Sequence, residues 1–146
     1  MGDLDADFPN LQAGAWQVTS PPDNRYNCIA FAVGRTDVYW WPDEYPDPNF
    51  DYWPPGILRE ESIAAFVQLF ESLAYEVCAD GTLEPGFVKI AIYALQDTPT
   101  HAARQLDTGQ WTSKLGVEED IVHEKLEALA GPCYGSAVQF MRRLIR

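Results

Sequence analysis

The sequence is poor in cysteine, in basic side chains and in long apolar runs. Its three cysteines, Cys28, Cys78 and Cys133, are too few and too far apart for a disulfide framework or a zinc knuckle. No apolar run approaches the roughly 20 residues of a membrane-spanning helix. Ten Lys and Arg against 22 Asp and Glu give a formal net charge of −12, which repels phosphate backbones and anionic lipid surfaces. We therefore expect no nucleic acid partner, no membrane partner, and no metal or other cofactor.

The sequence also lacks the short motifs of several large enzyme classes. It has no nucleophile elbow, phosphate-binding loop or dinucleotide-binding glycine pattern. The first residues, MGDLDADFPN, are acidic and have no apolar core, so we expect no export signal and a cytoplasmic protein. With 47% hydrophobic residues among 146, the chain can bury one core. We predict a single domain over 1–146, with an N-terminal arm at 1–23 and the core at 24–146.

Hydrophobic periodicity and turn residues predict the order of the elements. They indicate a buried helix at 28–33, a rigid loop at 39–56, an amphipathic helix at 60–78, a central strand at 87–95, a hairpin with arms at 100–106 and 110–115, a helix at 117–131 and a short closing helix at 136–146. Helices placed before and after a run of hairpin-connected strands predict the α+β class, with segregated helices against an antiparallel sheet.

Cys28 stands at the start of the first predicted helix, in the stretch NRYNCIAFAVG. Asn27 is a good N-cap and Gly34 a good stop, so the thiol faces the positive end of the helix dipole, which favours the thiolate. A nucleophile also needs a base, and His101, early on a predicted strand, is the natural candidate. The alternative is an inert buried thiol and a histidine that hydrogen-bonds a carbonyl group.

Three segments together resemble a known family: NCIAFAVG, THAARQL and GQWTSKLG. Their order resembles the papain-like fold, and within it the NlpC/P60-like thiol hydrolases and toxin-type bacterial relatives. The chain is also similar to an uncharacterised bacterial family with a histidine strand, a Trp-x-Ser-Lys-x-Gly segment and a downstream Ile-x-His. The resemblance implies a papain-like α+β fold, with Cys28 as nucleophile, His101 as base and Ser113 as the group that orients the imidazole. It implies a cysteine peptidase, amidase or glutamine deamidase that acts on an amide or isopeptide bond of a peptide or protein.

Further polar and aromatic residues are candidates for binding the substrate: Asn27, Trp40, Trp41, Trp53, Trp111, Lys114 and His123. The segment 39–56, YWWPDEYPDPNFDYWPPG, interleaves aromatic rings with prolines and acids. Its rings could form a cleft wall or could simply cover one end of the core. His123 follows Asp120 by three residues on a predicted helix, so the two side chains could pair on its surface.

A second function follows from the same acidic aromatic loop. The chain could be a catalytically silent binding or regulatory domain of the same fold that recognises a partner through 39–56. The sequence leaves the oligomeric state open.

Overall fold

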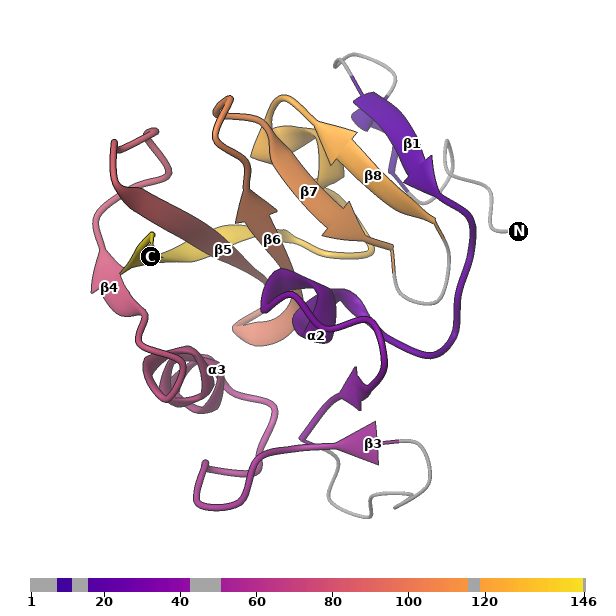
Figure 1. Ribbon diagram of the computed structural model, residues 1–146. Coiled ribbons are helices and arrows are strands. Elements are labelled where there is room, and N and C mark those ends of the chain that lie inside the picture. The colour runs from indigo at the N-terminus through magenta and orange to yellow at the C-terminus, as the bar shows by residue number, and fades with distance from the viewer. Residues whose placement is uncertain (1–7, 12–15, 43–50, 116–118, 146) are drawn as a thin grey trace.

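A seven-stranded antiparallel sheet forms the centre of the protein (Figure 1). The computed structural model describes residues 8–11, 16–42, 51–115 and 119–145. The strands are β1 (Trp16–Ser20), β4 (Glu76–Cys78), β5 (Phe87–Leu95), β6 (Thr98–Gln105), β7 (Trp111–Lys114), β8 (Asp120–His123) and β9 (Ser136–Leu144). They lie in the order β1-β8-β7-β6-β5-β9-β4.

Helical segments and a small second sheet lie beside the large sheet. The helical segments are α2 (Cys28–Ala32), α3 (Ile63–Glu71) and the 3-10 helix η2 (Leu126–Leu129). The strands β2 (Tyr39–Trp40) and β3 (Asp51–Tyr52) pair in parallel. This arrangement confirms the predicted α+β class. Within the described ranges, no helix combines the length and the apolar character needed to cross a membrane.

The elements with strong local signals form where the sequence predicts them. Asn27 caps α2 by accepting a hydrogen bond from the Ala30 amide, and Gly34 follows the helix with a φ of 87°. That backbone conformation favours glycine. The central strand predicted at 87–95 is β5, and the predicted hairpin arms correspond to β6 and β7.

Three segments predicted as helix are wholly or partly strands. The predicted helix at 117–131 is β8 followed by η2, and the predicted closing helix at 136–146 is β9. The helix predicted at 60–78 ends at Glu71, and its last residues form β4. Strand β9 lies between β5 and β4, so hydrogen bonds on both of its edges satisfy its backbone and override the helical spacing of its apolar residues.

Two further segments have more order than the sequence suggests. The predicted N-terminal arm contains β1, which pairs with β8 at one edge of the sheet. The predicted loop at 39–56 contains β2 and β3. Residues 43–50 of that loop lie outside the described residues.

The sheet separates two hydrophobic cores. The core on the α2 and α3 side includes Ile92 and Ala102, whereas the core on the η2 side includes Tyr93 and Ala103. This division follows from the alternation of side chains along β5 and β6, in which successive residues point to opposite faces.

Candidate functional site

The sheet has a gap between β6 and β7, and the N-terminal end of α2 covers it. In the described ladder, β6 and β7 pair only at Arg104 with Thr112 and at Gln105 with Trp111. The earlier part of β6 has no β7 partner there, and α2 packs against both strands instead (Figure 1). Because α2 begins at Cys28, the thiol lies at this gap.

Asn27 holds the start of α2 in place. Its Oδ1 accepts hydrogen bonds from the amides of Ala30 (3.2 Å) and Trp40 (3.1 Å), and its Nδ2 donates to the Trp40 carbonyl (2.7 Å). The side chain is buried. The structure therefore uses Asn27 to join α2 to β2, and both polar atoms predicted to bind substrate already have partners within the protein.

The Cys28 thiol is buried and protonated. It is 5% exposed and donates a long hydrogen bond to the Thr100 carbonyl (3.9 Å). Burial raises the pKa of Cys28 to about 11, while the backbone amides of Ala102, Ile29 and Cys28 itself lower it by less. The predicted lowering of the thiol pKa is wrong for this state. Because α2 has five residues, few peptide dipoles align at its start, and they do not offset the loss of water around the sulfur.

His101 is fully buried on β6, directly after Thr100, whose carbonyl Cys28 contacts. Its ring stacks on Tyr134 at a centroid distance of 4.3 Å and meets Tyr93 edge-on at 5.1 Å. Neither ring nitrogen has a hydrogen-bond partner in the described part of the chain. Burial lowers the pKa of His101 well below its ordinary value, so the ring is neutral.

Cys28 and His101 are close along β6, but their side chains do not form the predicted hydrogen-bonded pair. Cys28 belongs to the core that includes Ala102, and Ala102 points to the face opposite His101. Tyr134 lies close to both groups. Its ring stacks on His101. Its pKa is raised mainly by burial and further by the charge that Cys28 would carry as a thiolate.

Ser113 binds a histidine, but not the predicted one. Its Oγ lies 2.8 Å from Nε2 of His123, and Nδ1 of His123 lies 2.9 Å from the Lys125 carbonyl. A carbonyl only accepts, so Nδ1 carries the proton and Nε2 accepts from the Ser113 hydroxyl. The prediction that Ser113 orients His101 is wrong in this arrangement. His123 is a buried strand residue, not a helix-surface partner of Asp120, and burial lowers its pKa.

Lys114 is part of a buried charged cluster. Its Nζ lies 3.8 Å from Oδ1 of Asp120 and 4.7 Å from the centroid of the Tyr26 ring. The Tyr26 hydroxyl donates to Oδ2 of Asp120 at 2.6 Å. Burial and this hydrogen bond raise the pKa of Tyr26. Since Tyr26 comes just before Asn27, the cluster anchors the segment that leads into α2. Lys114, predicted to bind substrate, is therefore enclosed by the protein itself.

The predicted binding tryptophans are mostly core residues. Trp40 and Trp53 are buried, and Nε1 of Trp53 donates to the Leu58 carbonyl at 3.0 Å. Trp41 is half-buried and meets Phe66 of α3 edge-on at 5.5 Å. Trp111 is buried in the core on the η2 side. In the described residues, the aromatic segment thus covers the core, which was one of the two predicted roles.

Sequence reasoning missed Tyr26 and Tyr134. Tyr26 comes directly before Asn27 and Cys28, and this position in the sequence could have indicated a role for it. Tyr134 lies in a turn distant in the sequence, and only the fold brings its ring onto His101. Among the described residues, no three His, Cys, Asp or Glu side chains gather closely enough to hold a metal ion.

Comparison with known proteins gives one match. No curated protein matches the chain, and no solved structure matches it either. The profile of a family described as a domain of unknown function, DUF7689, matches residues 17–142, which include the gap, α2 and the whole of the large sheet except the first residue of β1 and the last two of β9. The chain therefore belongs to the DUF7689 family.

Proposed function

We propose that the protein is a papain-like thiol hydrolase or acyl transferase that acts on an amide or isopeptide bond of a peptide or protein. Cys28 is the nucleophile and His101 the base. The observation that carries this proposal is the His101 imidazole, which is fully buried and has no hydrogen-bond partner in the described residues. An unpaired buried polar group costs about 1–3 kcal/mol. This cost is explained if the imidazole forms its hydrogen bond only when a substrate is bound.

The protonation states suit a resting thiol enzyme. Burial keeps the Cys28 thiol protonated and the His101 ring neutral, so the ring can accept the proton. The Cys28 thiol contacts the carbonyl of Thr100, the residue before His101 on β6. The proposal requires β6 to rearrange when substrate enters, so that the imidazole and the sulfur, which face opposite sides of this strand, come together. Hydrogen bonds between catalytic groups often tighten only in the complex with substrate.

The reaction then follows in two stages. His101 takes the thiol proton while the sulfur attacks the carbonyl carbon, and the C–N bond breaks as the leaving amine takes that proton. Water, or an acceptor amine in acyl transfer, attacks the thioester, gives its proton to His101 and releases Cys28. The amides of Ala102 and Ile29 favour negative charge on the Cys28 sulfur. They therefore stabilise the thiolate that forms when His101 takes the proton.

The other predicted role, a catalytically silent domain that binds through 39–56, has weaker support. Trp40 and Trp53 of that segment are buried, so they offer little surface to a partner. Tyr52 is the exposed ring among the described residues of the segment, at 42% exposure. One exposed ring does not make a binding surface.

The test is hydrolysis by a chain that keeps Cys28 as its sole thiol, the double variant Cys78→Ala, Cys133→Ala. A panel of glutamine-containing and isopeptide-linked peptides is incubated with it, and released ammonia or amine is measured with the peptide masses. We expect Cys28→Ala and His101→Ala, each in that background, to lower the rate by roughly 100-fold or more. Circular dichroism shows whether each variant is folded.

Two results contradict the proposal. One is turnover that survives in folded Cys28→Ala. The other is a double variant that neither hydrolyses any peptide of the panel nor reacts at Cys28 with a peptide vinyl sulfone, a reagent that captures catalytic thiols.

A further inference from the structure

We propose that a surface pocket beside the C-terminal end of α3 binds a small organic anion with an apolar body. The pocket has a volume of about 900 Å³ and lies between the end of α3 and the adjacent strands β5, β6 and β9. Ligand sites for small molecules commonly measure about 300–1,000 Å³. The catalytic groups proposed above do not line it, so this inference does not depend on the proposed function.

The floor of the pocket is apolar. Its residues follow the alternation of three neighbouring strands, with Val88 on β5, Leu106 just after β6 and Ile145 just after β9. Leu73, from the turn after α3, closes one side. A floor of this kind favours a ligand with an apolar body, since covering it removes apolar surface from water.

Two arginines on the same face as the floor bring positive charge to the pocket. Arg104 lies on β6 and Arg143 on β9, each separated by one residue from a floor residue of its own segment. Both are half-buried. Neither forms an ion pair with any carboxylate that the structure describes, although acids outnumber bases by 22 to 10.

Both guanidinium groups are already positioned. Arg104 lies over the Phe31 ring of α2 at 5.8 Å, and Arg143 lies over the Tyr75 ring at 4.7 Å. Arg143 also donates to the Leu73 carbonyl at 3.2 Å. Stacking uses the flat face of a guanidinium and leaves N–H donors at its edge for an anionic group.

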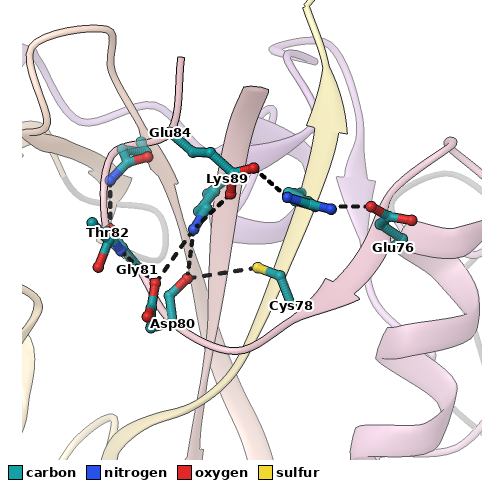
Figure 2. Close-up of polar contacts among 9 residues, drawn as sticks. Glu76, Cys78, Asp80, Gly81, Thr82, Glu84 and Lys89 are labelled. Carbon is teal, nitrogen blue, oxygen red and sulfur yellow. Dashed lines mark hydrogen bonds and ion pairs between the residues drawn. The ribbon is translucent and has the colours of Figure 1, made fainter. Parts of the chain in front are cut away.

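The opposite face of the same end of the sheet is different, because its cations have acidic partners (Figure 2). Lys89 lies between Asp80 and Glu84, each at 3.4 Å. Arg142, the neighbour of Arg143 on β9, pairs with Glu76 and Glu84. The absence of such partners at Arg104 and Arg143 is therefore specific to the pocket face, within the residues that the structure describes.

The chemistry of the ligand follows from this arrangement. Guanidinium groups bind carboxylates and phosphates through paired hydrogen bonds, so the ligand has one such head group near Arg104 and Arg143. Asp107 also lines the pocket, is exposed, and pairs with neither arginine. Its charge opposes a second anionic group on the ligand, which favours a single head group on an apolar chain.

The test is isothermal titration calorimetry of the full chain with octanoate and with octyl phosphate, which distinguish the two head groups. Octanamide, which has the same chain without charge, and acetate, which has the charge without the chain, are the controls. We expect octanoate or octyl phosphate to bind at least roughly tenfold more tightly than either control.

Variants then locate the site. Arg104→Met and Arg143→Met keep an apolar stem and should each weaken binding by roughly tenfold or more. The matched control is Arg25→Met, which removes the same charge from an exposed side chain paired with Asp23, and it should leave the affinity within about twofold.

The outcomes separate clearly. If octanamide binds as tightly as octanoate and octyl phosphate, the arginines do not select the ligand and the proposal is wrong. Failure of both anions to bind at millimolar concentration, or equal weakening by Arg25→Met, overturns it as well. The comparison of ligands needs no variant, so the proposal remains testable if Arg104→Met or Arg143→Met does not fold.

Discussion

The reactivity of Cys28 provides the most direct check on the buried resting site. A thiol with a pKa of about 11, in place of the ordinary 9.0, has roughly 100-fold less thiolate at pH 8, because each pKa unit changes that fraction about tenfold in this range. Thiolate is the form that reacts with iodoacetamide. Burial of the sulfur slows the reaction further. We therefore expect Cys28 in the folded protein to react at least roughly 100-fold more slowly than exposed Cys133.

The assay is alkylation of the folded chain at pH 8, with each cysteine followed by peptide mass. A second series in denaturant gives the alkylation rate of each thiol in the unfolded chain. The folded rate of each cysteine is divided by its unfolded rate, which removes the effect of neighbouring residues in the sequence. Equal rates for Cys28 and Cys133 in the folded protein would refute the buried, protonated thiol. An acceleration at Cys28 when a substrate peptide is added, absent in His101→Ala, would instead support the proposed rearrangement of the imidazole.

Three further predictions concern stability. Ser113→Ala should lower the free energy of unfolding by about 1–3 kcal/mol in urea titration, because it leaves Nε2 of buried His123 without its donor; an unchanged midpoint would contradict the hydrogen bond. Gly135→Ala should destabilise the protein far more than Gly86→Ala in thermal unfolding, although both glycines have positive φ. A Cβ at 135 would overlap the Ala94 carbonyl, whereas none of the described atoms lies within 4 Å of one at 86, so equal losses would count against this packing. The raised pKa of Cys28 means that its contribution to stability is present below pH 9 and is lost as pH rises toward 11. In urea titrations Cys28→Ala should therefore lose about 2 kcal/mol less than the wild type between pH 9 and 11, and equal losses would argue against a protonated thiol.

The sequence by itself determined the elements whose signals are local. Asn27 and Gly34 define the two ends of α2 through a side-chain cap and a positive φ, and neither needs a distant partner. The apolar run of β5 and the DTG connection between β6 and β7 are local in the same sense. The sequence therefore also placed Cys28 at a helix start and His101 on a strand correctly.

Tertiary structure decided the elements that depend on pairing. The apolar spacing of β8 and β9 fits a helix as well as a strand, and strand formation came from partners distant in the sequence, such as Met141 with Ile90 and Ile121 with Val18. Short apolar segments are ambiguous for this reason.

The orientation of side chains at the site was also decided by tertiary structure. One residue along β6 separates the face of Ala102, shared with Cys28, from the face of His101. Such a difference depends on strand register and on the irregularity beside Tyr93, neither of which is visible in the sequence. The arginine pocket depends even more on the fold, because Arg104 and Arg143 lie on strands that only β5 brings into one sheet.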